Sequence, residues 1–314
     1  MFNSILQNPV FQEIFKTKVI KVVAPASGMD PQKLNDLRTL PDLTIEIPPS
    51  LIADDIVYHA NSDEVRFNIL KNALLDPSEN TIVWTLRGGY GSARLLDQMR
   101  ALPIPKKQKI FIGFSDNTAL HLFLTQKWHW NTIHASGLAQ ILDAGQDPQN
   151  YMKIAEIIAQ KIPVQAFNHL QPLNAAAKAA DKIQGRLTGG NLTVLESGIG
   201  THWQAKTAKK ILFLEDTGEK GYRIDRSLYH LRQAGLIKNV KAVVFGEFSD
   251  ENKDPTITTA LQRFAKDVSI PVYQTDQFGH GKINYPLVYN AKAEIAASSS
   301  EGYTMKMKIT TYRG

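Results

Sequence analysis

Short apolar runs rich in β-branched residues alternate with helical patterns through the first half of the chain. The runs that predict strands are residues 18–25, 43–48, 81–86, 109–114 and 132–136. Between two of them, Val65, Ile69 and Ala73 recur at helical spacing behind a Ser62 or Asp63 cap. Such alternation predicts an α/β fold, with a parallel sheet sandwiched between helices in the Rossmann or flavodoxin manner.

The second half of the chain is richer in strand patterns. The regular pattern loosens over residues 163–183, which contain prolines and an alanine-rich stretch, and we interpret this segment as an interdomain connection. Strongly apolar strand patterns return at 210–216 and 240–248, with a helical pattern between them, and most of the remaining sequence is strand-like. We therefore predict an N-terminal α/β domain, a linker and a smaller β-rich C-terminal domain, at residues 1–162, 163–183 and 184–314.

Composition limits the class of protein. Of 314 residues, 43% are hydrophobic and 21% are charged, which fits a globular protein rather than a disordered or fibrous one. The absence of cysteine excludes disulfides, thiolate metal sites and a thiol nucleophile, and agrees with a reducing compartment. The net charge of +6 comes without a basic run, so we expect no nucleic-acid partner, although a weak positive field would attract an anionic substrate.

Other sequence signals bear on location and metals. The N-terminus lacks the pattern of a signal peptide, and no 18 consecutive residues are apolar, so we expect a cytoplasmic protein without a membrane partner. None of the eight histidines lies in an H-E-x-x-H or comparable pattern, so we expect no metal site.

Three polar residues point to hydrolytic chemistry. Ser115 follows the strand pattern at 109–114, Glu215 follows the apolar part of 210–216, and His280 lies between two glycines. A serine hydroxyl becomes a nucleophile when an imidazole takes its proton and a carboxylate orients that imidazole. The order serine, acid, histidine is also that of α/β-hydrolases, but order alone is weak evidence, and taken by itself the stretch around Ser115 is better explained by a glycine turn with a helix cap.

A serine hydrolase also needs donors for the oxyanion. The RGGYGS segment at 87–92 follows a predicted strand, so Gly88 or Gly89 can offer one backbone N–H, and Asp116 another. The same segment could instead hold a phosphate, but it lacks the third glycine of a dinucleotide site, and no P-loop pattern occurs.

Several neighbouring residues have simpler interpretations. Glu219 competes with Glu215 for the acid role, although Glu215 has the better strand-end position. Asn191 in GGN fits a helix cap, and Arg87 and Arg223 fit surface ion pairs.

Five blocks of sequence, taken together, resemble the L,D-carboxypeptidase family of serine peptidases, which includes the microcin-C immunity peptidases. The blocks, in family order, are RGGYGSARLL, GFSDNTALH, LEDTGEKGYRIDRSLYHLRQAG, VFGEF and FGHGKINYPL. The YNAKAEI segment departs from the family's more usual glycine-containing version, which bears on local substrate contacts.

The resemblance implies a two-domain homodimer that needs no metal or organic cofactor. It makes Ser115 the nucleophile, Glu215 the acid and His280 the base, with oxyanion donors from Gly88 and Asp116. The implied reaction is hydrolysis of the L,D-amide bond to terminal D-alanine in muropeptide tetrapeptides during cell-wall recycling.

Two alternative functions are also compatible with this sequence. A peptidase that cleaves aminoacyl-nucleotide antibiotics would use the same triad, and an aromatic ring placed to stack on the nucleobase would distinguish it. Trp84, Trp128, Trp130 and Trp203 are available for this, although each is better explained as a core or interface residue. A non-catalytic ligand-binding relative would keep the fold without turnover.

Overall fold

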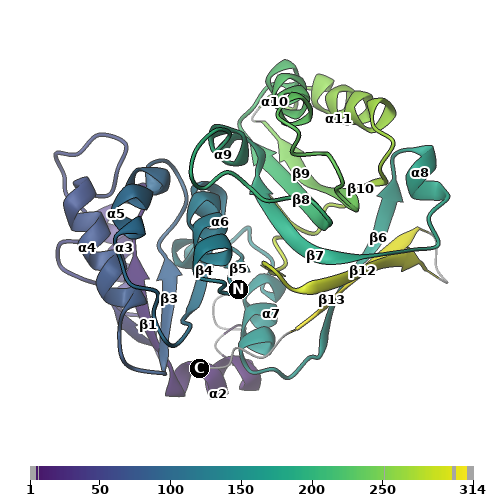
Figure 1. Cartoon of the computed structure of the whole chain (residues 1–314). Helices are drawn as coiled ribbons and strands as arrows, with labels where there is room; N and C mark the ends of the chain where they lie inside the picture. The colour runs from purple at the N-terminus through teal and green to yellow at the C-terminus, as the bar shows by residue number, and fades with distance from the viewer. Residues whose placement is uncertain (1–4, 6, 251, 299–301, 310–314) are drawn as a thin grey trace. The chain divides into compact units, whose positions relative to one another are not determined.

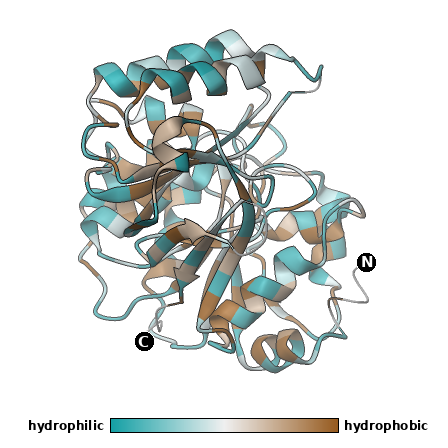
Figure 2. Ribbon diagram, turned by 90° about the vertical axis from the view of Figure 1, so that its right-hand side faces the viewer, coloured by the Kyte–Doolittle hydropathy of each residue, from teal (hydrophilic) through white to brown (hydrophobic). Residues whose placement is uncertain are grey.

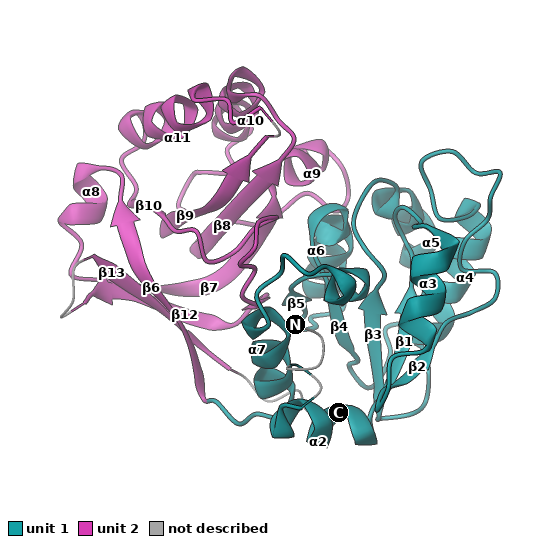
Figure 3. Ribbon diagram, turned by 180° about the vertical axis from the view of Figure 1, so that it is seen from behind, with its two compact units in different colours: residues 1–162, 311–314 teal, residues 163–310 magenta. Residues whose placement is uncertain are grey.

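The structure of the chain is a computed structural model that describes residues 5, 7–250, 252–298 and 302–309 (Figure 1). The chain forms two compact units, of which unit 1 extends to Ile162 and unit 2 begins at Pro163 (Figure 3). None of the helices in the described part of the chain is long and apolar enough to cross a membrane.

Unit 1 contains the alternating strands and helices that the sequence predicts. Its strands are β1 (Val19–Val23), β2 (Thr44–Glu46), β3 (Thr81–Thr85), β4 (Ile110–Gly113) and β5 (Ile133–His134). Its α-helices are α2 (Pro9–Thr17), α3 (Pro31–Arg38), α4 (Asp63–Leu74), α5 (Leu96–Arg100), α6 (Thr118–Lys127) and α7 (Gln149–Ile158). Short 3-10 turns are η1 (Ser92–Leu95), η2 (Ser115–Asn117) and η3 (Leu138–Leu142).

The strands of unit 1 lie in the order β2-β1-β3-β4-β5, and every pairing between them is parallel. This is the order of flavodoxin-like sheets, so the sequence prediction of the fold is confirmed. In such sheets the strand order reverses between β1 and β3, and ligands bind beyond the carboxyl ends of the strands there. The loops that follow β1, β3 and β4 are therefore the first place to look for a site.

Helices cover both faces of this sheet. Trp84 of β3 contacts Phe15 of α2 and Tyr151 of α7, with ring centroids 6.0 and 6.2 Å apart. On the opposite face, Phe111 of β4 packs edge-on against His121 of α6. Figure 2 shows that the helices carry apolar and polar residues in alternation, as expected for elements with one buried side.

Unit 2 combines a barrel with covering helices. Its strands are β6 (Val164–Pro172), β7 (Lys182–Asn191), β8 (Lys210–Thr217), β9 (Ala242–Ser249), β10 (Val272–Gln274), β11 (Leu287–Val288), β12 (Lys292–Ala297) and β13 (Tyr303–Lys308). Its helices are α8 (Ala175–Lys178), α9 (Leu192–Ser197), α10 (Gly221–Gln233) and α11 (Thr256–Asp267).

Seven of these strands close into a barrel in the order β10-β6-β13-β12-β7-β8-β9. The pairs β7-β8, β8-β9 and β9-β10 are parallel, and α10 and α11 supply the crossovers between the last three of these strands. The pairings of β12 and β13 are antiparallel. The described C-terminal strands agree with the predicted β-rich domain, while residues 310–314 lie outside the described part.

The predicted linker over residues 163–183 requires a correction. Most of this segment forms β6 and α8 within unit 2, and β6 pairs with both β13 and β10. The pairing is irregular beside Tyr303, and His169 has a φ of 57°. Buried side chains at Phe167 and Leu170 are consequently three positions apart. A bulge therefore hides the period-two pattern that would have identified the strand.

Candidate active site

Ser115 occupies a sharp turn between β4 and α6. Phe114 is extended, with φ of −156° and ψ of −173°, and Ser115 follows in the left-handed region with φ of 59°. A residue with a Cβ rarely adopts this conformation, and such strain concentrates at functional positions. The turn has the strand-to-helix form of a nucleophile elbow, which exposes a serine hydroxyl at the end of a sheet.

The backbone of Gly88 lies directly against Ser115. A Cβ added at Gly88 would fall 2.6 Å from the Ser115 Cβ and 2.8 Å from its Oγ. Its position is 3.6 Å from the backbone nitrogen of Asp116. Unit 1 thus gathers three of the predicted site residues at the carboxyl ends of β3 and β4.

Asn117 connects the two loops that form this arrangement. Its fully buried side-chain amide donates to the carbonyl oxygens of Phe114 and Arg87, at 3.1 and 3.2 Å, and to Thr85 Oγ1 at 3.4 Å. One side chain therefore ties the turn after β4 to the chain that leaves β3, immediately before Gly88.

The Asp116 side chain has a structural role. Its carboxylate accepts a hydrogen bond from Ser92 N–H at 2.8 Å, and its carbonyl oxygen accepts one from Ser92 Oγ at 2.5 Å. Burial raises the pKa of the Asp116 carboxyl, against the opposing effect of the hydrogen bonds from Ser92 and Gly91. These contacts anchor the residue whose backbone N–H the sequence predicts as an oxyanion donor.

Arg66 adds a third connection among the loops. This fully buried side chain of α4 donates to the carbonyl oxygens of Pro25, after β1, and Gly91, after β3. It also pairs with Asp63 at 2.5 Å. A buried guanidinium satisfied in this way fixes the loops at the reversal point of the sheet, because its planar donors have set directions.

Unit 2 brings Glu215 and His280 together. Glu215 lies near the carboxyl end of β8 with no exposed surface, and its Oε2 is 2.6 Å from Nδ1 of His280. The imidazole is only slightly exposed, with 15% of the side chain accessible. A short contact between a buried carboxylate and an imidazole nitrogen orients the ring and leaves Nε2 as the nitrogen that can exchange a proton with another group.

The neighbouring Asp216 is engaged in a different way. Its carboxylate accepts hydrogen bonds from the Asn191 side chain, from Thr193 and from Thr217 N–H, all at 2.8–2.9 Å. Burial, and then the charge of Glu215, raise its pKa to about 6. Asp216 therefore fastens the start of α9 to β8, and Glu215 is the acid directed at the histidine.

Glu247 of β9 supports the loop that carries His280. Its N–H donates to the carbonyl of Phe278 at 2.8 Å, and its carboxylate accepts from the backbone of Gly281. A Cβ at Gly279 would lie 2.8 Å from the Glu247 Cβ, so this glycine, at φ of 139°, permits the close approach. The loop is therefore held against β9 on both sides of the imidazole.

Charges around His280 set its pKa. Burial lowers it, but Glu215 acts against burial through charge and hydrogen bonding, and Asp216 and Glu247 add their negative charges. The net effect raises the pKa of His280 above its usual value of 6.5. The ring is consequently well suited to take up a proton, and it holds that proton to a higher pH than a free histidine.

The simpler interpretations fit the structure for Asn191, Glu219 and Arg223, but the ion pair expected of Arg87 is not found among the described residues. Asn191 is the N-cap of α9 and accepts from Val194 N–H. Glu219, the competing acid, pairs with Arg223 at 2.5 Å. Arg87 is exposed, and its guanidinium donates to the Gly28 carbonyl at 3.4 Å rather than to a carboxylate.

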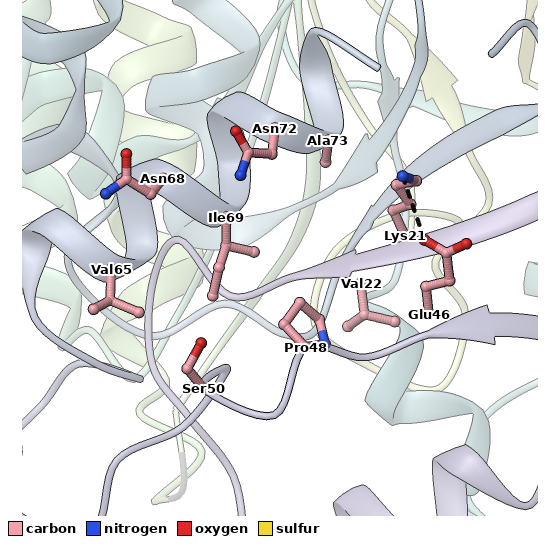
Figure 4. Close-up of a pocket in the computed structure, with 10 residues that line it drawn as sticks. All are labelled: Lys21, Val22, Glu46, Pro48, Ser50, Val65, Asn68, Ile69, Asn72 and Ala73. Carbon is pink, nitrogen blue, oxygen red and sulfur yellow. Dashed lines mark ion pairs between the residues drawn. The ribbon is translucent and has the colours of Figure 1, made fainter. Parts of the chain in front are cut away.

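A cavity of about 440 Å³ lies elsewhere in unit 1, between α4 and the β1-β2 edge (Figure 4). Val22, Val65 and Ile69 form part of its wall, and Lys21 at its rim pairs with Glu46 at 3.3 Å and also with Asp76. None of the predicted site residues lines this cavity.

Sequence reasoning missed Arg66, Asn117 and Glu247. Asn117 and Glu247 lie inside the blocks GFSDNTALH and VFGEF, yet their side-chain contacts depend on folding. Arg66 lies in a segment with a helical pattern, and no motif includes it. The one available signal is that this arginine lies next to Val65, an apolar position of the helix.

Comparison with known proteins places the chain among peptidases. A protein of Rickettsia conorii that is named as a carboxypeptidase is 49% identical over 280 residues, which cover 89% of this chain and 88% of the relative. Residues 20–135 match the LD-carboxypeptidase N-terminal domain, and residues 184–295 match the LD-carboxypeptidase C-terminal domain. The chain belongs to the LD-carboxypeptidase family.

Members of this family with described activities are also similar. The murein tetrapeptide carboxypeptidase of Pseudomonas aeruginosa is 32% identical over 251 residues, which cover 75% of this chain and 78% of the relative. The crystal structure of muramoyltetrapeptide carboxypeptidase from Oxalobacter formigenes matches with a TM-score of 0.78 at 25% identity, over 93% of this chain and 99% of that one.

A microcin C7 self immunity protein, solved with aspartyl sulfamoyl adenosine, shares the fold at 18% identity, with a TM-score of 0.77 over 95% of this chain and 97% of that one. Family membership confirms the resemblance seen in the sequence, and this chain is a serine carboxypeptidase.

Proposed function

We propose that this serine carboxypeptidase hydrolyses the L,D-amide bond to the terminal D-alanine of murein tetrapeptides. The hydrogen bond between Glu215 and His280, within a chain of this family, is the observation that carries the proposal. The names of the Pseudomonas and Oxalobacter relatives support the choice of a murein tetrapeptide as substrate.

In the proposed first half-reaction, Ser115 Oγ attacks the carbonyl carbon of the L-configured residue while His280 Nε2 takes the hydroxyl proton. The tetrahedral intermediate then expels the D-alanine amine, which receives that proton from His280. Glu215 keeps the ring oriented through Nδ1 and stabilises its cation. The products of this half are free D-alanine and an ester between Ser115 and the shortened peptide.

The second half-reaction repeats these roles with water. His280 takes a proton from water, the resulting oxygen nucleophile attacks the ester, and the proton passes to Ser115 as the ester bond breaks. The peptide leaves with a new carboxylate and the serine is restored. Since His280 must be neutral at the start of each half, its raised pKa sets a lower pH limit for the reaction.

We assign the oxyanion site to the backbone N–H groups of Asp116 and Gly88. Asp116 immediately follows the proposed nucleophile, as the first oxyanion donor does in an elbow of this type. The Gly88 backbone lies close to the Ser115 side chain because glycine has no Cβ. A single donor of this kind contributes about 3–4 kcal/mol to transition-state stabilisation.

Burial removes the tryptophans as candidates for stacking on a nucleobase. Each of the four tryptophans is at least 95% buried, so none offers a face for a nucleobase; they are Trp84, Trp128, Trp130 and Trp203.

A non-catalytic relative is disfavoured for a different reason. Burial of the Glu215 and His280 pair costs desolvation free energy, and ligand binding alone does not require such a pair.

The central experiment incubates the purified chain with murein tetrapeptide and measures the loss of one alanine by mass spectrometry. We expect the tripeptide and D-alanine from the wild type and a loss of several orders of magnitude in Ser115→Ala. Ser115→Ala that retained the wild-type rate would remove the nucleophile assignment. Faster cleavage of an aminoacyl sulfamoyl adenylate than of tetrapeptide would favour the antibiotic peptidase instead.

We also propose that the chain acts as a homodimer in the cytoplasm, as the family resemblance implies. Light scattering coupled to size-exclusion chromatography should give twice the mass of 35.0 kDa for the chain. A monomeric mass at micromolar concentration, with full activity, would contradict the dimer.

A further inference from the structure

A second cavity, of about 650 Å³, lies at one end of the barrel in unit 2. Its charged lining residues are Arg186, Lys209, Lys292, Lys306, Lys308 and the single carboxylate Glu294. We refer to it as the basic cavity. It is remote from the histidine site along the barrel, since Lys210 begins β8 and Glu215 lies five residues further on, about 16 Å for an extended strand.

Like charges face one another across the strands of this cavity. Lys292 of β12 is directly opposite Arg186 of β7, and Arg186 is directly opposite Lys210 of β8. Lys308 of β13 follows Met307, whose partner Ala293 is the neighbour of Lys292, so the row of cations continues onto a fourth strand. Directly opposed like charges destabilise a sheet.

The architecture of the barrel does not account for this row. Lysines often protect the unpaired edge of a sheet against aggregation, but these strands belong to a closed barrel and have neighbours on both sides. Protection of an edge is therefore not needed where the row lies. A ligand of opposite charge remains as a reason for concentrating cations there.

The basic cavity has one carboxylate among five cations, and this residue, Glu294, lies directly opposite Lys306 on the paired strands. Glu294 pairs with Lys182 at 2.8 Å and accepts from Gln184, and none of the five cations that line the cavity forms an ion pair with a described carboxylate. Burial, and then the charges of Lys206 and Arg186, lower the pKa of Lys210. The other cavity differs, because its Lys21 has two carboxylate partners (Figure 4).

We propose that the basic cavity binds a small anion with several phosphate groups. Lysine and arginine are the usual phosphate ligands, and arginine adds donors in a fixed plane, one of which in Arg186 already bonds to the Asn290 carbonyl at 2.6 Å. From Arg186 on β7 across Lys292 on β12 to Lys308 on β13, all of which line the cavity, the row crosses two strand intervals, about 10 Å, which exceeds the reach of one phosphate and suits a di- or triphosphate chain. The cavity volume is within the range of small-molecule sites, and its concavity favours a small ligand over a duplex.

The test titrates inorganic tripolyphosphate into the full chain by isothermal calorimetry at low salt. We expect saturable binding of one anion per chain, with monophosphate at least tenfold weaker. The double variant Arg186→Gln with Lys292→Gln should weaken binding at least tenfold. Lys292→Arg should stay within about threefold of the wild type, since it keeps the charge.

The matched control is Lys266→Gln, which removes one charge from an exposed position on α11 of the same unit. Binding within twofold of the wild type in this control supports a defined site. Absence of binding, or equal weakening in the control and in the double variant, overturns the proposal. Tighter binding of a DNA duplex with the same dependence on Arg186 and Lys292 also overturns it, because the occupant would then be a nucleic acid.

Discussion

Glu215 Oε2 lies 2.6 Å from His280 Nδ1 in unit 2, and Glu215 is fully shielded from solvent. The two residues are 65 positions apart in the sequence, and β8 and the glycine-flanked loop bring them together. A carboxylate in this position controls both the orientation and the charge of the ring.

Glu215→Gln should lower kcat by about 10³- to 10⁴-fold, because the neutral amide stabilises the wrong tautomer and not the imidazolium. The release of D-alanine from tetrapeptide, measured with circular dichroism as a check on folding, tests this. Glu219→Gln is the control, since that glutamate pairs with Arg223 and should leave kcat within twofold. Equal losses in both variants would contradict the assignment of the acid.

The raised pKa of His280 predicts an acidic limb in kcat/KM whose midpoint lies above pH 6.5. Glu247→Gln removes a negative charge that favours the imidazolium, so the pKa should fall and the limb should move to lower pH. Asp267→Asn, a change at an exposed carboxylate of α11 that pairs with Arg232, should leave the limb in place. NMR titration of the His280 ring distinguishes a change in its pKa from a purely structural effect. An unchanged ring pKa in Glu247→Gln would refute the role of the Glu247 charge.

Gly88→Ala tests the close approach of backbone and nucleophile. The added methyl would lie 2.6 Å from the Ser115 Cβ, so the loop after β3 must move away. We expect a fall in kcat/KM of about 10²-fold or more, similar to removal of an oxyanion donor. Gly145→Ala is the control, because a Cβ there meets nothing within 4 Å. Wild-type activity in Gly88→Ala would exclude Gly88 from the oxyanion site.

Asn117→Ala should reduce both stability and activity, since it removes the buried side-chain amide that donates to the carbonyl oxygens of Phe114 and Arg87. The expected loss in the free energy of unfolding is about 1–3 kcal/mol, measured by urea denaturation. Asn72→Ala, at an exposed position of α4, should change it by less than about 0.5 kcal/mol. If Asn117→Ala and Asn72→Ala have the same stability, the side chain does not tie the loops together.

The sequence predicts elements well where one periodicity persists. The fully buried run Thr81–Thr85 and the cap at Ser62, whose hydroxyl accepts from Val65 N–H, leave little ambiguity in unit 1. β6 was missed because a bulge near His169 interrupts its alternation and because its partners β13 and β10 lie a hundred residues or more away in sequence. Local pattern alone cannot identify a strand whose stability comes from distant pairing.

The candidate site divides in a similar way. Residues whose chemistry is rare in a given position, such as Ser115 at a strand end and His280 between glycines, are visible in the sequence. Asn117, Arg66 and Glu247 hold loops through contacts to backbone carbonyls and amides, and no local sequence pattern marks such contacts. Their role follows only from the direction in which each side chain points after folding.

The left-handed backbone of Ser115, at φ of 59°, costs a non-glycine residue about 1–2 kcal/mol. Glycine would adopt the same angles without that cost, but it has no hydroxyl. On the proposed mechanism, the chain therefore gives up some thermal resistance at this residue in exchange for reactivity. A screen that rewards heat tolerance alone would tend to favour an inert enzyme.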